Sequence, residues 1–269
     1  MKTSLDLKTP FDFNNQVVLV TGGTRGIGLA ITQSFLEGGA QVVVCGRKNP
    51  EQPITGGGRE AVFIAADVRD AEQVNQLAAQ IRERFQRLDV VINNAGGSPP
   101  SDSATASPRF TESIVRLNLL APFYVSQAAY PLMHAQESGG LIINIASVSA
   151  VRPSPFTTMY GAAKAGLISM TKSLAIEWAP KIRVNTIIVG LINTEESAPH
   201  YGGEEGVKKI AATIPSGRFG TPEDVAGMCV FLASPLATFV NGTALEVHGG
   251  LEVPRYLEGA MYEKSKKQA

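Results

Sequence analysis

The chain has 269 residues, of which 44% are hydrophobic and 18% are charged, and its 24 Lys and Arg balance 24 Asp and Glu. This length and composition suit a single soluble α/β domain with a large core. A net charge of zero provides no global field that would attract nucleic acid or an anionic membrane, so we expect neither as a partner.

Residues 1–16 lack the continuous apolar stretch of a signal peptide, and no run of about 18 apolar residues occurs anywhere in the chain. We therefore expect a cytoplasmic protein. Its two cysteines, Cys45 and Cys229, lie in apolar segments without metal-like or redox spacing, which predicts buried free thiols. We expect no metal in the catalytic step, because the histidines are scattered: they are His134, His200 and His248.

Short β-rich runs recur along the chain, and most are continuously apolar, as in strands that helices cover on both faces. They occupy residues 17–20, 42–45, 62–65, 90–93, 141–146, 184–189 and 244–247. The clearest helical pattern between them is 71–87, with Asp70 and Gln73 as a possible capping box. This alternation predicts right-handed βαβ units and a single Rossmann-like, doubly wound parallel sheet of about seven strands with helices on both faces.

We expect this domain to span residues 17–250, between an N-terminal arm of residues 1–16 and a C-terminal tail of residues 251–269. Segment 47–60 is rich in Pro and Gly and too short for a full crossover helix, so we expect a loop there. Ligands of a doubly wound sheet bind beyond the carboxyl ends of its strands. The residues that follow each strand are therefore the candidates for chemistry.

The first strand runs directly into Thr21-Gly22-Gly23-Thr24-Arg25-Gly26-Ile27-Gly28, which is followed by a helix with apolar periodicity. Glycines at this point permit a tight turn and let the backbone approach a pyrophosphate, which the helix N-terminus stabilises. A glycine-rich stretch alone is often only a flexible turn. Its place between a strand and a helix predicts a dinucleotide-binding site.

The second strand ends at Gly46-Arg47. NAD-binding enzymes place an acidic residue near this point, about 20 residues beyond the glycines, to hold a ribose hydroxyl. No carboxylate is present here to repel a 2′-phosphate, whereas Arg47 and Arg25 carry guanidinium groups that pair well with phosphate. The sequence therefore predicts NADPH/NADP+ as the cofactor, the alternative being that both arginines are simply solvated.

Lys164 follows Tyr160 by four residues, and Ser147 precedes Tyr160 by thirteen at the end of the fifth strand. If the segment is helical, the Lys164 ammonium lies under the phenol. Lowering a tyrosine pKa from about 10 to about 7 requires roughly 4 kcal/mol of phenolate stabilisation, which a close, partly desolvated cation supplies. The spacing alone is also typical of a solvated helix face, so the surrounding motifs decide its meaning.

Taken together, these motifs resemble the short-chain dehydrogenase/reductase (SDR) family, in its single-domain, NADP-preferring form. The matching residues are Gly22, Gly26 and Gly28, then Asn93-Asn94-Ala95-Gly96, and finally Asn118, Ser147, Tyr160 and Lys164. The resemblance implies that the last four form a catalytic tetrad. Tyr160 would exchange a proton with the substrate oxygen, Ser147 would hold the oxyanion, Lys164 would also bind the nicotinamide ribose, and Asn118 would support a chain of water molecules.

The resemblance also implies the cofactor contacts. Asp67 and Val68 would border the adenine, and Thr194 would hydrogen-bond the nicotinamide carboxamide. The expected set is Gly22, Thr24, Arg25, Gly26, Ile27, Gly28, Arg47, Asp67, Val68, Asn94, Ala95, Gly96, Tyr160, Lys164, Gly190, Ile192 and Thr194. Two departures stand out: Val189 replaces the proline of the family's Pro-Gly loop, and His248, expected to be structural, replaces an aspartate.

Substrate choice is expected to fall to residues 97–110, 148–159 and 195–215, because loops on a rigid scaffold usually carry such differences. The segment from about 190 to 216 has the glycine and polar content of a mobile lid. The expected reaction is hydride transfer between NADPH and an uncharged or modestly polar ketone or secondary alcohol. Arg152 would bind an anionic group if the substrate carries one.

The main alternative is reduction of 3-oxoacyl groups on acyl carrier protein or coenzyme A. Acidic residues in the lid would repel these negative carriers, and two lysines close behind would offset that repulsion. The residues concerned are Glu195, Glu196, Glu204 and Glu205, and Lys208 and Lys209. An alternative of another class is a non-catalytic NADPH-binding sensor or scaffold. By resemblance, we expect a homo-oligomer, either a tetramer or a dimer.

Overall fold

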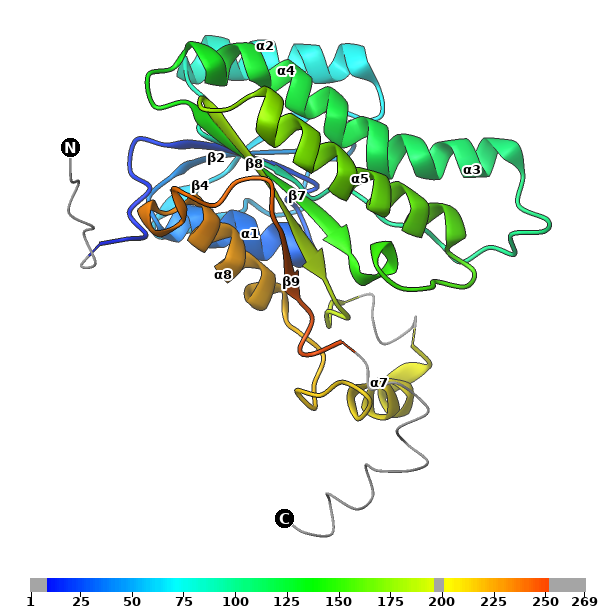
Figure 1. Ribbon diagram of the computed structural model, residues 1–269. Coiled ribbons are helices and arrows are strands. Elements are labelled where there is room, and N and C mark those ends of the chain that lie inside the picture. The colour runs from blue at the N-terminus through cyan, green and yellow to red at the C-terminus, as the bar shows by residue number, and fades with distance from the viewer. Residues whose placement is uncertain (1–8, 196–200, 252–269) are drawn as a thin grey trace.

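The computed structural model describes residues 9–195 and 201–251. Its centre is a parallel sheet of seven strands in the order β5-β2-β1-β6-β7-β8-β9 (Figure 1). These strands are β1 (Val17–Thr21), β2 (Gln41–Gly46), β5 (Val62–Ala65), β6 (Val90–Asn93), β7 (Gly140–Ser147), β8 (Ile182–Val189) and β9 (Ala244–Val247). The prediction of a doubly wound Rossmann-like sheet is confirmed, and each predicted run lies within an observed strand.

Helices cover both faces of the sheet, with α2, α4 and α5 on one side and α1 and α8 on the other (Figure 1). The helices are α1 (Gly26–Glu37), α2 (Ala71–Phe85), α3 (Pro108–Val115), α4 (Ala121–Ala135), α5 (Thr158–Glu177), α7 (Gly203–Ala211) and α8 (Pro222–Ala233). The chain builds outward from β1 to β2 and β5, then returns to β6 on the other side of β1. In sheets of this kind, ligands bind beyond the carboxyl ends of the strands that flank the reversal, which here are β1 and β6.

The loop expected at residues 47–60 contains a short antiparallel hairpin, β3 (Thr55–Gly56) with β4 (Arg59–Glu60). Two consecutive glycines between these strands, Gly57 and Gly58, have φ values of +56° and +74°. Tight hairpin turns need positive φ at their central residues, and glycine adopts it without steric cost. The segment is thus more ordered than predicted, although it holds no crossover helix.

The capping box predicted for α2 forms only in part. The Asp70 carboxylate accepts hydrogen bonds from the backbone N–H groups of Glu72 (2.9 Å) and Gln73 (3.3 Å). The Gln73 side chain, however, accepts from the Asp67 N–H (2.9 Å) and donates to the Asp70 carboxylate (2.9 Å). Gln73 therefore connects the helix to the turn after β5 instead of closing the box.

The segment expected to form a substrate loop at 195–215 contains helix α7. Its first turn holds Glu204 and Glu205 and its last turn holds Lys208 and Lys209, so the charges complement the helix dipole. Glu205 and Lys209 also form an ion pair at 3.6 Å. The predicted lid residues 196–200, with His200, and the tail beyond Leu251 lie outside the described residues, as do residues 1–8.

Two large apolar clusters pack against opposite faces of the sheet. Cys45 and Cys229 are free and buried in these clusters, as the sequence predicts, and burial raises the pKa of Cys45 to about 12. Such thiols are unreactive, because the thiolate is the nucleophile. Within residues 9–195 and 201–251, no helix has both the length and the apolar character needed to cross a membrane.

Candidate active site

The glycine turn between β1 and α1 is packed so closely that larger residues do not fit. Gly22 and Gly26 have φ values of +63° and +50°, which L-residues with side chains seldom adopt. A Cβ atom on Gly28 would collide with the Gly22 carbonyl and lie 2.6 Å from the Asn94 amide nitrogen. The turn is therefore a tight glycine cradle at a helix N-terminus, which suits a pyrophosphate group.

Thr21, at the end of β1, joins this turn to the strand beside it. Its hydroxyl oxygen accepts hydrogen bonds from the N–H groups of Asn94 and Ala95, both at 3.0 Å. The Asn94 side chain in turn donates to the carbonyls of Thr21 (3.0 Å) and Gly22 (3.1 Å). Thr21 was not among the residues expected at the site, although a polar residue that ends an apolar strand is a signal for such a role.

Asn118 lies in a π-helical segment, η1 (Arg116–Leu120), that connects α3 to α4. Its side-chain amide donates to the carbonyls of Gly97 (2.9 Å) and Ile114 (3.0 Å), and its oxygen accepts from the Gly97 N–H (2.9 Å). A Cβ atom on Gly96 would lie 2.8 Å from the Asn118 oxygen and 3.1 Å from the Lys164 ammonium. The backbone at Gly96 thus passes directly over two of the predicted tetrad residues.

Ser147 is the last residue of β7, while Tyr160 and Lys164 lie one turn apart on α5. The Lys164 ammonium donates to the Ile145 carbonyl (2.7 Å) and lies 5.8 Å from the centroid of the Tyr160 ring. A hydrogen bond with Ser147 favours the Tyr160 phenolate and lowers its pKa, but burial has the larger effect. The structure therefore brings all four predicted tetrad residues to one end of the sheet.

The acid–base balance of this pair differs from the expectation. Burial raises the pKa of Tyr160 above its ordinary value, and burial also lowers the pKa of Lys164 to about 8. Desolvation disfavours the charged form of each group, and for Tyr160 it outweighs the hydrogen bond with Ser147. The protein alone therefore holds a protonated phenol at neutral pH, so the lowered phenol pKa expected from the sequence is not found.

Charged residues gather at the ends of β2 and β5. Arg47 is exposed after β2, and its charge contributes to lowering the pKa of Asp67. The larger cause is Arg69, whose guanidinium contacts both carboxylate oxygens of Asp67, at 2.9 Å to Oδ1 and 2.6 Å to Oδ2. Arg69 was not among the expected site residues, although an arginine two residues after the aspartate is a visible signal for such a pair.

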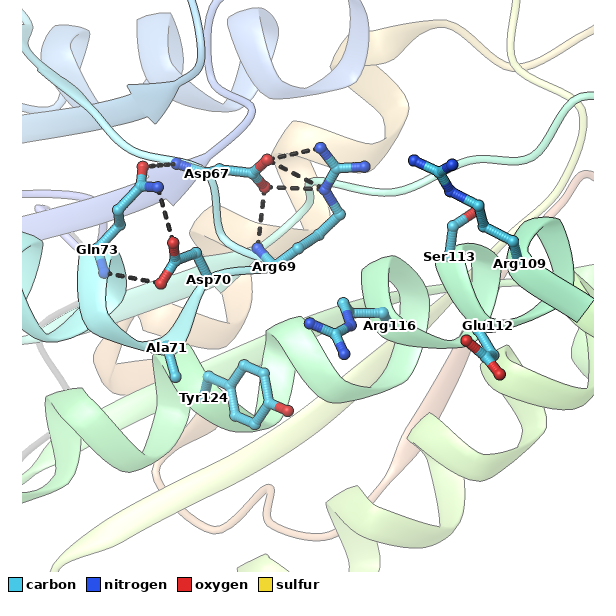
Figure 2. A pocket seen from close by; sticks show the side chains of 10 residues that line it. All are labelled: Asp67, Arg69, Asp70, Ala71, Gln73, Arg109, Glu112, Ser113, Arg116 and Tyr124. Atoms are coloured by element: carbon cyan, nitrogen blue, oxygen red, sulfur yellow. Dashed lines mark hydrogen bonds and ion pairs between the residues drawn. The ribbon is translucent and has the colours of Figure 1, made fainter.

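A cavity of about 640 Å³ opens beside Asp67, between the start of α2 and the α3–η1 segment. Figure 2 shows Arg69 turned toward Asp67, with Gln73 joined to Asp67 and Asp70. The lining residues are Asp67, Arg69, Asp70, Ala71, Gln73, Arg109, Glu112, Ser113, Arg116 and Tyr124. Val68, the other residue expected to border the adenine, is 7% exposed and belongs to the hydrophobic core.

The segment after β8 returns to the glycine turn. Val189 extends β8 and pairs with Val247, and the Gly190 N–H donates to the Val247 carbonyl (2.9 Å). Valine in place of proline is thus accommodated as part of a strand. Beyond it, Ile192 forms a parallel bridge with Gly220, and a Cβ atom on Gly26 would lie 3.5 Å from the Thr194 methyl group.

His248 has a structural contact, as expected. Its Nε2 atom lies 2.6 Å from the Glu246 carboxylate, and its Nδ1 atom accepts from the Gly250 N–H (3.2 Å). It also leaves no room for a side chain on Gly190, where a Cβ atom would lie 2.6 Å from the His248 Cβ. The histidine therefore stabilises the turn after β9.

Two residues from separate segments, Tyr201 and Arg152, also affect the electrostatic balance of the site. The Tyr201 ring packs on Phe219 with centroids 5.4 Å apart, and its charge, when ionised, would raise the pKa of Tyr160. Arg152 lowers the pKa of Tyr201, although burial raises it more. Tyr201 was not selected in the sequence, because no periodicity or motif marks it.

The strand order, the glycine cradle and the buried Ser-Tyr-Lys group define a Rossmann-type oxidoreductase domain. A family model described as enoyl-(acyl carrier protein) reductase matches residues 22–252. The 3α-hydroxysteroid dehydrogenase of Mediterraneibacter gnavus is 36% identical over 250 residues, which cover 87% of this chain and 96% of that protein. The 3-oxoacyl-[acyl-carrier-protein] reductase FabG of Chlamydia pneumoniae is 37% identical over 240 residues, covering 87% and 96%.

Among solved structures, the aldohexose dehydrogenase of Thermoplasma acidophilum aligns with a TM-score of 0.83 at 30% identity, covering 88% of this chain and 94% of that one. The chain therefore belongs to the short-chain dehydrogenase/reductase family, as its motifs indicated. It is an oxidoreductase, and dehydrogenases of this family use nicotinamide cofactors.

Proposed function

We propose that the protein catalyses hydride transfer between NADPH and a ketone or secondary alcohol, with Tyr160 as the general acid and base. The observation that carries this proposal is the convergence of Asn118, Ser147, Tyr160 and Lys164 beside a glycine cradle at the reversal point of the sheet. The cradle fits a dinucleotide, because Gly22 and Gly26 adopt the positive φ of a tight turn at a helix N-terminus and Gly28 lets the turn pack closely against that helix.

When bound, NADPH supplies a hydride to the carbonyl carbon. Tyr160 donates its proton to the carbonyl oxygen in reduction, and its phenolate accepts that proton in oxidation. The raised pKa of Tyr160 keeps the phenol protonated near neutral pH, which favours its role as an acid in reduction. Ser147 hydrogen-bonds the Tyr160 hydroxyl and is placed to stabilise negative charge on the substrate oxygen.

Lys164 and Asn118 support this proton transfer. The Lys164 amine lies beside the Tyr160 ring and beneath Gly96, where it would bind the ribose hydroxyls. The Asn118 side chain accepts a hydrogen bond from the Gly97 N–H and donates one to the Gly97 carbonyl, which fixes the backbone at this point. Since all four residues are intact and close together, a non-catalytic sensor or scaffold is disfavoured.

A preference for NADPH over NADH is supported by charge. β2 ends at Gly46 and is followed by the exposed Arg47, without a carboxylate at this position to hold a ribose hydroxyl. Arg25 is exposed at the start of α1, on the same edge of the sheet. These two arginines would pair with a 2′-phosphate.

Steady-state kinetics with both cofactors test this preference. The wild-type enzyme should have the higher kcat/KM with NADPH, and Arg47→Gln should lower that value about tenfold or more while changing the value with NADH little, because a charge-assisted bond is lost. Arg84→Gln, an exposed change on α2, serves as the control. A higher wild-type kcat/KM with NADH would overturn the assignment.

A second candidate is reduction of 3-oxoacyl thioesters, the reaction for which the C. pneumoniae relative is named. The α7 helix carries two exposed acids and two exposed lysines, so it presents no net charge to a negative carrier. A panel of free ketones, secondary alcohols and acyl thioesters, assayed with NADPH or NADP+, separates these functions.

Homo-oligomers are common among these enzymes, and we propose a tetramer or dimer, which light scattering on the purified protein tests.

A further inference from the structure

A hydroxyl on the helix that follows the glycine turn holds the turn on its inner side. Thr32 lies on α1, one turn after Gly28, and is completely buried. Its hydroxyl donates to two carbonyl oxygens, that of Gly28 at 2.8 Å and that of Gly23 at 3.1 Å. The first contact is common, since a helical Thr often bonds the carbonyl four residues earlier. The second reaches out of the helix and into the turn.

Close packing fixes this hydroxyl beside Gly23, which is itself buried. A Cβ atom on Gly23 would lie 2.7 Å from the Thr32 hydroxyl oxygen and 2.6 Å from a methyl carbon of Val44 on β2. Both distances are shorter than a side chain tolerates. The glycine thus lets α1 and β2 touch the backbone of the turn, and Thr32 supplies the hydrogen bond that a buried carbonyl needs there.

The orientation of one peptide group follows from this contact. The peptide bond between Gly23 and Thr24 is trans, so its C=O and N–H groups point in opposite directions. Because the Gly23 carbonyl points at the Thr32 hydroxyl, the Thr24 N–H points away from that hydroxyl. A rotation of this peptide would break the bond and redirect the N–H. Thr32 therefore fixes the direction of a donor in the turn.

The protein itself also binds the neighbouring polar groups of the turn. The Gly22 N–H donates to the Cys45 carbonyl (2.9 Å), and the Gly22 carbonyl accepts from the Asn94 side chain (3.1 Å). With the Gly23 carbonyl bound to Thr32, the first half of the turn is fastened to the strands and to α1. The first N–H groups of a helix have no partner within it, so those of α1 are the donors suited to an anion.

From this geometry we propose that Thr32 is a positioning residue for the cofactor, because its hydroxyl fixes the peptide between Gly23 and Thr24 and so holds the turn in the shape that binds a pyrophosphate. Since Thr32 is completely buried, it acts through Gly23 and not by contact with the ligand. The inference rests on the dinucleotide binding in the proposed function. It is independent of the substrate and of the choice between NADPH and NADH.

Three changes at residue 32 separate the hydroxyl from the volume of the side chain. Thr32→Val keeps the volume without the hydroxyl, Thr32→Ala removes both, and Thr32→Ser keeps the hydroxyl alone. The Val and Ala variants should each raise the Kd for NADPH and NADH by about tenfold, because the Gly23 carbonyl loses its partner and the turn relaxes. The Ser variant should stay within about threefold of the wild type, and fluorescence titration of the full-length protein measures all of these values.

Ser126→Ala is the matched control. Ser126 is completely buried in α4, and its hydroxyl also donates to the carbonyl four residues earlier, that of Pro122 (2.7 Å). This change should lower the melting temperature, since a buried hydrogen bond is lost, but keep both Kd values within about twofold. Equal increases in Kd from Ser126→Ala and Thr32→Val would show general loosening of the protein and overturn the proposal.

Fragments of the cofactor locate the effect on the ligand. ADP-ribose carries the pyrophosphate, whereas adenosine carries no phosphate. In displacement of NADPH, Thr32→Val should weaken ADP-ribose by about the same tenfold and leave adenosine within about twofold, because the turn contacts phosphate. Equal weakening of adenosine and ADP-ribose would contradict a role in the pyrophosphate cradle.

The binding measurements also separate this inference from the proposed function. Val and Ala variants that bind NADPH with the wild-type Kd would overturn the role of Thr32 and leave the proposed function intact. Wild-type protein that binds NADPH but turns over no carbonyl or alcohol would contradict the proposed function, and the Kd comparison would still decide the role of Thr32. Wild-type protein that binds no dinucleotide would contradict both.

Discussion

Lys164 occupies an environment that is unusual for a lysine. Its side chain is almost completely inside the protein, with 3% exposure, and its ammonium donates to the Ile145 carbonyl. Burial lowers its pKa from the ordinary 10.5 to about 8. A buried ammonium therefore reduces stability at neutral pH, and the penalty disappears when the amine becomes neutral.

This linkage predicts a pH dependence for Lys164→Met. Between pH 8 and 10.5 the folded protein loses the Lys164 proton while the unfolded chain retains it, so wild-type stability should rise with pH relative to the variant. The full rise should be about 3 kcal/mol. Urea unfolding of both proteins across this range measures it, and the effects of the cysteines cancel in the difference. A difference that stays constant with pH would contradict the lowered pKa.

The proximity of the proposed catalytic residues could be predicted from sequence, but their titration could not. Spacing on a helix identifies Tyr160 and Lys164 as neighbours, whereas a pKa depends on burial by distant segments. The same limitation applies to Tyr201, whose charge, when ionised, would raise the pKa of Tyr160 although the two residues are far apart in the chain.

At the scale of elements, the glycine turn shows how packing restricts sequence. Gly28 and Gly227 both lie inside helices, α1 and α8. A Cβ on Gly28 would meet the Gly22 backbone, whereas a Cβ on Gly227 would meet no atom within 4 Å. Gly28 is therefore held in contact with the cradle, whereas Gly227 faces open space.

Alanine at these two positions should therefore have opposite effects. Gly28→Ala should lower the free energy of unfolding by about 1–3 kcal/mol through overpacking and should weaken cofactor binding strongly. Gly227→Ala should raise it by about 0.5–1 kcal/mol, because alanine is the better helix former. Chemical unfolding and NADPH titration measure both quantities. Equal effects of the two changes would contradict the account of the turn.

Elements differed in how well the sequence predicted them. Continuous apolar runs identified all seven strands of the sheet, because burial on both faces leaves a strong pattern. The β3–β4 hairpin and helix α7 were missed, since the first depends on positive φ at Gly57 and Gly58 and the second is held by charges at its ends. The π-helical turn at Asn118 also leaves no periodic signal.

Across the whole molecule, the two hydrophobic layers include residues from outside the predicted sheet domain. Phe13, in the expected N-terminal arm, is 1% exposed and packs on Phe35 of α1 at 5.0 Å between ring centroids. Its backbone also accepts from Gln16 and donates to Gly38. At least this part of the arm contributes to the core, which no local pattern in residues 1–16 indicated.

Two Phe→Ala changes test this description of the core. Phe13→Ala should cost about 3–5 kcal/mol of unfolding free energy, because it leaves a cavity beneath α1. Phe239→Ala removes a fully exposed ring and should change the value by less than about 0.5 kcal/mol. Denaturant unfolding at a fixed protein concentration compares them. A cost for Phe13→Ala as small as that for Phe239→Ala would contradict the placement of Phe13 in the core.

The central claim, that Tyr160 transfers the proton, is tested most directly by single-turnover reduction with Tyr160→Phe. This change removes the ionisable hydroxyl and keeps the ring, so the rate of the chemical step should fall by about a thousandfold. The Kd for NADPH should remain within about twofold. Tyr130→Phe, whose ring packs on His134 and Trp178, is the control and should match the wild type. A Tyr160→Phe enzyme that bound NADPH and reduced its substrate at the wild-type rate would contradict the proposed mechanism.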